Sequence, residues 1–368
     1  MEMRAHYTQS GSQIRFIPHP SACRCKVACR IDSPSIALMQ PALALAKSAV
    51  VAGMLALTAL YPVISPGQSS STNLPKLIKI VVPFAPGAST DILSRLVAQK
   101  LGARIGSTMV VENRPGATGS IGADYVSRAV ADGSTLMVTG IVFTANAAVQ
   151  PKLPFDPVNG FAPVAMLASG PQILAVANES PYKSTAELLD AARANKGKLN
   201  YGSTGIGSSQ HLNTAQFNRM AGTEMTHVPF KGGGPAVTNL IGGHIQVMIF
   251  SYSTLMPHVI SGKIRALAVT SPTRSRFAPN LPTLSETVPG FSAESWWAIL
   301  APAATPQPVV NRLNAEIRAI VSSPEMRAVF DKEGVDPASM TACEFTAFVR
   351  SDIDKWRDVA RKLNIVAE

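Results

Sequence analysis

The feature that most constrains the fold of this chain is a regular alternation of strand-like and helix-like runs from Leu77 onward. The apolar run LIKIVV precedes a turn containing proline and glycine, and the next segment, ILSRLVAQKLG, repeats apolar residues at helical spacing. Two more strand-like runs, TMVVEN and STLMVTG, complete a βαβαβ series. Such a series predicts a parallel sheet with right-handed crossovers.

A second series of the same kind begins near Lys198 with KLNYG, a glycine- and hydroxyl-rich turn and a helix. Between the two series, FAPVAMLASGPQILAVANE predicts strands that lead from one lobe to the other. We therefore predict an α/β fold of two lobes, each a mostly parallel sheet flanked by helices, with a ligand cleft between them. The predicted bounds are 76–172 plus 291–368 for lobe 1 and 173–290 for lobe 2.

The N-terminal region differs from the rest of the chain. Ala49 to Leu60 is an apolar run of 12 residues, too short to span a bilayer but typical of the central segment of a secretory signal peptide. A core helix is the alternative. Because about 45 residues precede this run, we predict that translation starts at Met39, that export uses residues 39–70, and that residues 1–75 lie outside the mature fold.

Composition favours a packed core and argues against a nucleic-acid partner. Hydrophobic residues make up 46% of the chain, and 33 Lys and Arg against 23 Asp and Glu give a net charge of +10. The mature part has no basic run of five or more residues and no aromatic platform, so no nucleic-acid partner is predicted. A mildly positive field instead helps to gather anionic solutes.

Two turns stand at the predicted carboxyl ends of strands, where open parallel sheets bind ligands. They are PFAPGASTD (83–91) and GSTGIGSS (202–209). Each opens a helix, so each presents unpaired backbone N–H groups and the positive end of a helix dipole. Two such ends facing each other predict an anion site without a buried cation.

The sequence offers little for catalysis or metal binding. GSTGIGSS lacks the GK[ST] of a phosphate-binding loop, and no G-x-S-x-G elbow is present. No H-x-x-x-H motif or carboxylate pair suggests a metal. Asp91 is either an acid or, as is commoner, a residue that fixes the turn by accepting N–H bonds. His211, near Ser208 and Ser209, more often caps or packs in such a position. We predict no catalytic residue, no metal and no cofactor.

The chain resembles a known family in an ordered set of segments that runs from about Lys76 to the end. These are IKIVVPFAPGASTDILSRLVAQKLG, VVENRPGATGSIGADYVSRAVADGSTLMV, KLNYGSTGIGSSQHL, HVPFKGGGPAVTNLIGG, GKIRALAVTS and the W-x-x-x-A-P-A-x-T-P element at Trp297–Pro306. They are similar to the substrate-binding proteins of tripartite tricarboxylate transporters, the Bug family. The resemblance implies a type 2 periplasmic-binding-protein fold that closes like a Venus flytrap around small carboxylates.

The resemblance also implies which residues bind the ligand. The family uses the two loops that match 83–91 and 202–209, and positions at strand ends usually line its cleft. The predicted ligand-binding residues are Phe84, Gly87, Ala88, Ser89, Asp91, Ser203, Thr204, Gly205 and Ser208 in the loops, and Thr139, Asn146 and Ser251 at strand ends.

The sequence departs from the family pattern at two places. Ala88 stands where the family turn commonly has a second glycine, and MIFSY lacks the acidic residue that some members carry, which favours a plain carboxylate over an amino acid. Lys231 either meets an anionic ligand or lies on the surface. Trp296 and Trp297 either pack in the core or at the hinge, or stack on a ligand.

We therefore predict a monomeric, periplasmic, non-catalytic solute-binding protein. It would capture a small organic carboxylate and deliver it to the permease subunits of a tripartite transporter. Two rival functions remain open at this point: a sensing module for a two-component kinase without transport, and an enzyme on the same fold.

Overall fold

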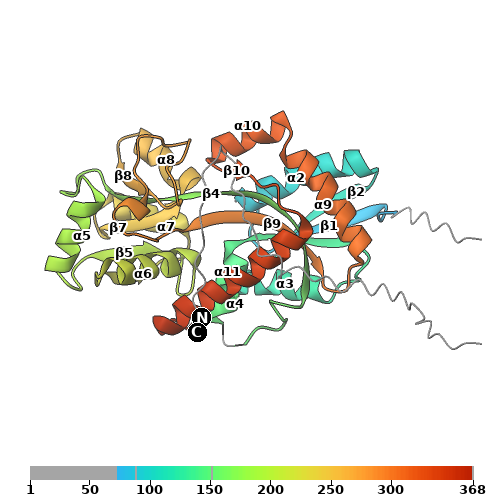
Figure 1. Cartoon of the computed structure of the whole chain (residues 1–368), viewed down its shortest axis with the longest axis horizontal. Coiled ribbons are helices and arrows are strands. Elements are labelled where there is room, and N and C mark those ends of the chain that lie inside the picture. The colour runs from blue at the N-terminus through green and yellow to red at the C-terminus, as the bar shows by residue number, and fades with distance from the viewer. Residues whose placement is uncertain (1–72, 88, 151, 367–368) are drawn as a thin grey trace, which may run out of the picture. The chain divides into compact units, whose positions relative to one another are not determined.

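The computed structural model describes residues 73–87, 89–150 and 152–366. The predicted signal peptide at 39–70 and the position of Ala88 therefore lie outside the described residues. The described part forms two groups of elements that are joined by two long strands (Figure 1). This is the α/β fold with two groups of parallel strands that the sequence predicts, so the predicted fold class is confirmed.

The first group holds the parallel strands of the first series, in the order β2-β1-β3. Its N-terminal elements are β1 (Leu77–Val82), α2 (Ser89–Ile105), β2 (Thr108–Asn113), α3 (Ser120–Ser127), β3 (Thr135–Gly140) and α4 (Ile141–Val149). Its C-terminal elements are α9 (Gln307–Val321), α10 (Pro324–Glu333), β10 (Asp336–Pro337) and α11 (Ala342–Lys362). The segment SIGADYVSRAVADG predicts a helix that continues to the glycine at 133, but in the structure this helix, α3, ends at Ser127.

The second group repeats this arrangement with strand order β7-β5-β6, also parallel. Its elements are α5 (Thr185–Ala194), β5 (Asn200–Ser203), α6 (Ser209–Ala221), β6 (Thr226–Pro229), α7 (Gly233–Ile241), β7 (Val247–Ser251), α8 (Tyr252–Ile260) and β8 (Ile264–Val269). α6 begins at the cap Ser208 and ends at Gly222, whose φ of 65° suits glycine.

Two antiparallel strands, β4 (Phe161–Ala177) and β9 (Glu294–Pro302), connect the groups. β4 pairs with β9 as far as Pro171 and with β7 from Gln172 onward, so one continuous strand belongs to both sheets. From this change of partner we propose that the hinge lies at residues 171–172, and the lobe bounds of the preceding subsection stay a prediction.

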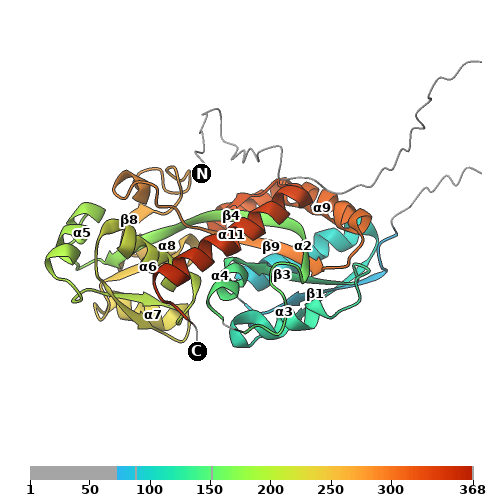
Figure 2. The same cartoon turned by 60° about the horizontal axis from the view of Figure 1, so that its bottom comes forward.

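Helix α11 covers the connecting strands. Its apolar residues recur at helical spacing, and its first turn carries a capping box between Thr341 and Glu344. Figure 1 and Figure 2 show its C-terminal end beside α6, and contacts between the two helices agree with that view.

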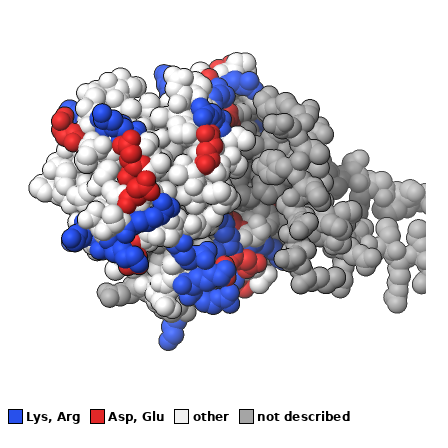
Figure 3. Space-filling view, turned by 60° about the vertical axis from the view of Figure 1, so that its left-hand side comes forward, with Lys and Arg blue, Asp and Glu red and all other residues white. Residues whose placement is uncertain are grey.

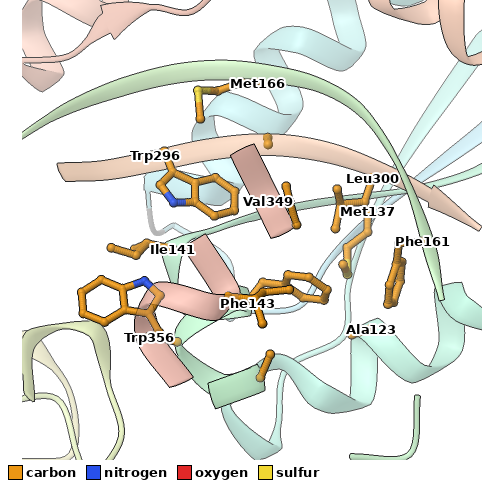
Figure 4. Packing of buried hydrophobic residues seen from close by; sticks show 14 of the residues in the cluster. Ala123, Met137, Ile141, Phe143, Phe161, Met166, Trp296, Leu300, Val349 and Trp356 are labelled. Atoms are coloured by element: carbon orange, nitrogen blue, oxygen red, sulfur yellow. The ribbon is translucent and has the colours of Figure 1, made fainter. Parts of the chain in front are cut away.

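The core around Trp296 combines residues from both ends of the described chain. It contains Val81 of β1 and Leu212 of α6. It also contains Phe143 of α4, Trp296 of β9 and Trp356 of α11 (Figure 4). Burial of these aromatic rings makes this cluster a major source of stability.

Charged side chains are mixed on the face that Figure 3 draws. Lys and Arg gather in its lower part, with Asp and Glu between them and large uncharged areas above. This pattern is typical of a solvated surface rather than a nucleic-acid-binding stripe. Among the described residues, every helix is too short or too polar to cross a lipid bilayer.

Candidate functional site

The first predicted turn follows β1 and leads into α2, and Asp91 holds it together. The buried Asp91 carboxylate accepts a hydrogen bond from the backbone N–H of Gly87 (N···Oδ2 3.1 Å) and from Asn113 (Nδ2···Oδ1 2.9 Å). Arg95 Nη2 lies 3.0 Å from Asp91 Oδ1. Hydrogen bonds from Arg95, Asn113 and Gly87 outweigh burial and lower the pKa of Asp91 to about 2.

Asn113, the last residue of β2, holds both ends of this turn. Its Nδ2 also donates to the carbonyl oxygen of Phe84 (3.1 Å). The half-buried Phe84 and Gly87, with φ of 90°, thus lie on a turn that is bonded from two sides. The interpretation of Asp91 as a residue that fixes the turn agrees with these contacts.

A third turn, from Gly116 to Ser120, lies against the first one and was missed from the sequence as part of the site. A methyl group added at Gly119 would be in ordinary contact with Pro83 and Phe84. Ala117 and Thr118 have φ of 45° and 53°, an uncommon conformation for residues with a side chain. The signal that could have revealed this turn is PGATGS, which places glycines beside a hydroxyl as in the other two.

The second predicted turn follows β5 and leads into α6. Ser203 is fully buried, its Oγ lies 2.6 Å from His227 Nε2, and it accepts the N–H of Gly205 (3.1 Å). Thr204 donates to Gln210 Oε1 (2.9 Å), and Ser208 accepts the N–H of His211 (3.3 Å) as the cap of α6. Ser203 and Ser208 therefore shape the turn through bonds within the protein.

Two histidines support the second turn. The rings of His211 and His227 are stacked, with centroids 3.7 Å apart and an angle of 5° between the planes. His211 Nδ1 accepts the backbone N–H of Gly207 (3.1 Å). Burial lowers the pKa of both imidazoles to about 4, and the charge of His227 adds to the shift of His211, so both are neutral at pH 7.

From its position in the sequence His211 is expected to cap or pack, while His227 is isolated from other candidate residues in the sequence. His227 reaches Ser203 because β6 pairs in parallel with β5, in a register that places His227 opposite Tyr201. The pair was missed because this register brings together residues that lie 24 positions apart in the sequence.

The three predicted strand-end residues lie in different settings. Thr139 is buried near the end of β3, and Ser251 ends β7, where its Oγ lies 2.7 Å from Thr254 Oγ1. The strand-end placement of Asn146 is wrong, because this residue is buried within α4. Its Nδ2 donates to Ser120 Oγ (2.9 Å), so Asn146 supports the third turn from the side.

The two tryptophans and the lysine singled out from the sequence lie outside these turns. Trp296 packs in the core and donates through Nε1 to Asp352 (3.3 Å), while Trp297 is half-buried against the neighbouring cluster. Both therefore pack at the connecting strands, as one of the two interpretations expected. Lys231 is exposed between β6 and α7. Among the described residues, no group of three or more His, Cys, Asp or Glu side chains could hold a metal ion.

These features define a class of protein. Two parallel α/β groups share two crossing strands, and each carries βα turns whose helix N-termini offer backbone N–H groups. That combination is the architecture of a two-lobed solute-binding protein. Its turns are stiffened by internal hydrogen bonds, as a preorganised binding site requires.

The particular family follows from comparison with known proteins. A family model described as "Tripartite tricarboxylate transporter family receptor" matches residues 93–365, and the chain belongs to that family. Members of the family are periplasmic solute-binding receptors and not enzymes, so the protein is a binding protein.

Relatives and solved structures agree with this membership. Protein BugT of Bordetella pertussis is 32% identical over 297 residues, which cover 80% of this chain and 91% of BugT. An R. palustris protein solved with adipate is 34% identical, with a TM-score of 0.70 and coverage of 79% of this chain and 98% of that one. MatC from Rhodopseudomonas palustris with bound malate is 30% identical, with a TM-score of 0.68 and coverage of 77% and 98%.

Proposed function

We propose that this protein captures a small organic carboxylate between its two lobes and delivers it to the membrane permease of a tripartite transporter. The observation that carries the proposal is the pair of turns before α2 and α6. Each ends in a helix N-terminus, and each is held by buried internal bonds, through Asp91 in one and through the stacked histidines in the other. Helix N-termini held in this way favour an anion.

The relatives support the same ligand class. Adipate and malate, the ligands named for two of the similar structures, are dicarboxylates. A carboxylate accepts hydrogen bonds only, so backbone N–H groups and hydroxyls are sufficient partners for it. Membership in the receptor family of tripartite transporters supports a permease as the protein partner.

We assign two kinds of role within the proposed site. The backbone N–H of Ser89 and the hydroxyl of Thr204 are candidates for direct contact, because they belong to the turns themselves. The N–H groups of Gly87 and Gly205 are already bonded to Asp91 and Ser203, so these two glycines remain proposed lining residues. Ser203, Ser208 and Asp91 position these turns through the bonds given above. Ala88 keeps its predicted role as a ligand-side residue, and Phe84, Thr139, Asn146 and Ser251 remain proposed lining residues.

The proposal is tested by thermal unfolding of the purified protein with di- and tricarboxylates and aromatic acids, together with mass spectrometry of ligand that co-purifies. At least one acid should raise the melting temperature. A broad panel that gives no shift, with turnover of any substrate, would contradict a carrier function.

A matched pair of variants tests the location of the site. Thr204→Val removes a hydroxyl from the second turn and should weaken binding about fivefold or more, the size expected for one lost hydrogen bond. Thr238→Val removes a hydroxyl that bonds the carbonyl oxygen of Gly234 within α7, and should leave affinity unchanged. Equal affinities in both variants would mean that the site is misplaced.

We also propose that the protein reaches the periplasm through a signal peptide within residues 39–70. The apolar run at 49–60 and the periplasmic location of the family support this. Mass spectrometry of the exported protein should show an N-terminus near residue 70, and an N-terminus upstream of the apolar run would contradict the proposal.

A further inference from the structure

Three buried polar atoms on α6 have no hydrogen-bond partner among the described residues. One is Oε1 of the half-buried Gln216, and the other two lie in almost fully buried residues: Oγ of Ser209 (1% exposed) and Oδ1 of Asn213 (0% exposed). An unpaired buried polar atom costs about 1–3 kcal/mol, so a partner for both is expected when the protein is at work.

These two atoms lie on the same face of α6, because residues four positions apart on a helix are neighbours. Side chains on a helix also tilt toward its N-terminus, which brings the amide of Asn213 toward Ser209. Ser209 directly follows Ser208, the cap at the turn where we propose that the carboxylate binds. Of the two unpaired atoms, Ser209 Oγ therefore lies beside the proposed site, and Asn213 Oδ1 lies one helical turn further along α6.

The other end of the Asn213 amide reaches the hinge. Its Nδ2 donates to Gln172 Oε1 (2.9 Å), and Gln172 Nε2 donates to Ser295 Oγ (3.2 Å). Gln172 is the residue at which β4 changes its partner from β9 to β7. Asn213 thus lies where the strands cross between the lobes.

Helix α6 also packs against the first group of elements. Leu212 is a member of the core cluster around Trp296, and α6 contacts both α4 and α11. The unpaired atoms therefore lie on a helix that is in contact with elements of both groups.

The donors and acceptors in the hydrogen-bond chain Asn213–Gln172–Ser295 can all be exchanged, because both amides can be turned over and the Ser295 hydroxyl can donate or accept. In either direction one atom of the Asn213 amide stays unpaired, either the acceptor Oδ1 or the donor Nδ2. A carboxylate, which only accepts, cannot satisfy Oδ1, and an ammonium, which only donates, cannot satisfy Nδ2. A hydroxyl both donates and accepts, so it suits both arrangements and the Ser209 hydroxyl as well.

We propose that Ser209 and Asn213 form a polar subsite that receives a hydroxyl substituent on the carbon chain of the ligand. The inference rests on the proposed function for the position of the ligand carboxylate, and it narrows the ligand class to hydroxy-substituted carboxylic acids. Ser209 and Asn213 are then residues that determine specificity, next to turns that bind the carboxylate of any such acid.

The experiment compares matched pairs of acids by isothermal titration calorimetry on the full mature protein. The pairs are succinate with malate, glutarate with 2-hydroxyglutarate, and adipate with 2-hydroxyadipate, each hydroxy acid as both enantiomers. One hydroxy acid should bind about tenfold tighter than its parent, the factor expected for a well-made buried hydrogen bond. In Ser209→Ala and Asn213→Ala this preference should fall to about twofold or less.

Controls keep the result interpretable. Ser209→Ala breaks no hydrogen bond within the described protein, so it tests the subsite even if Asn213→Ala, which frees Gln172, fails to fold. Thr214→Val removes a hydroxyl that bonds the carbonyl oxygen of Gln210 on the same helix, and it should keep the tenfold preference.

Each other outcome overturns a specific statement. Equal binding of parent and hydroxy acids by the unaltered protein, as expected if an ordered water fills the subsite, overturns the subsite but leaves the carrier proposal intact. A tenfold preference for the hydroxy acid that persists in both Ser209→Ala and Asn213→Ala also overturns the subsite and leaves the carrier proposal intact. Failure of all the acids, and of the broader panel above, overturns the proposed function and this inference with it.

Discussion

Replacing Asp91 by asparagine should destabilise the protein by an amount that the structure allows us to work out. The bonds from Arg95, Asn113 and Gly87 lower the pKa of this carboxyl from its usual 3.8 to about 2. Each tenfold change in acid dissociation corresponds to about 1.36 kcal/mol, so the buried carboxylate contributes about 2.4 kcal/mol at neutral pH. Asp91→Asn removes that contribution and leaves an amide NH2 group facing two donors, Arg95 together with either Gly87 or Asn113.

The pH dependence identifies the cause. Because the pKa of Asp91 is lower in the folded than in the unfolded state, its contribution is complete above about pH 5 and is lost as the pH falls from 3.8 through 2. Urea unfolding followed by tryptophan fluorescence should therefore give a difference of at least about 2 kcal/mol at pH 7. The part that depends on ionisation should be roughly half as large at pH 3.

A matched control separates burial from simple ion pairing. Asp124 on α3 pairs with Arg128 four residues later, as Asp91 pairs with Arg95, but its side chain is more exposed (27% against 5%). Asp124→Asn should cost no more than about 0.5 kcal/mol, as is usual for surface pairs. A loss at pH 7 in Asp91→Asn as small as in Asp124→Asn, or one that is the same at pH 7 and pH 3, would refute the reasoning.

Two further predictions concern the supports of the fold. The pKa of His211 and of His227 is lowered from 6.5 to about 4 in the folded protein, so the unfolded chain takes up protons first as the pH falls. The free energy of unfolding should therefore fall by roughly 2 kcal/mol for each imidazole between pH 7 and pH 5. Urea unfolding at both pH values measures this, and a fall that is undiminished in His227→Gln would count against it. Gly334→Ala should lower the free energy of unfolding by about 1 kcal/mol more than Gly222→Ala. Both glycines have a similar positive φ, but only at Gly334 would the added methyl group overlap a ring, that of Tyr252. Thermal unfolding that ranks the two variants equally would rule out this overlap as a cost.

The order of strands and helices could be predicted from the sequence because hydrophobic periodicity is local. The strand-like runs at 77–82, 108–113 and 135–140 and the helical pattern of α2 appear in the structure as predicted. The fold class followed from the same alternation. The end of α3 and the helix around Asn146 were missed because these short apolar segments give no clear period.

The turn residues could be predicted only in part. Asp91 was recognised as a support because a carboxylate at a helix start commonly accepts N–H bonds. The His227–Ser203 contact depends on strand register, and the Asn213–Gln172 contact joins residues 41 positions apart, so neither follows from local pattern. Backbone conformation at Ala117 and Thr118 is likewise invisible in the residue types.

The interleaving of the two groups has a consequence for the order in which the chain can fold. The cluster around Phe217 uses residues from Leu174 to Ala293, so its parts are all present before the last fifth of the chain is made. The cluster around Trp296 extends from Val81 to Ala360 and cannot be completed until α11 has emerged. The group that contains the first-synthesised strands is therefore the last to complete its core. A chain cut short before α11 would present an open hydrophobic surface to chaperones and proteases.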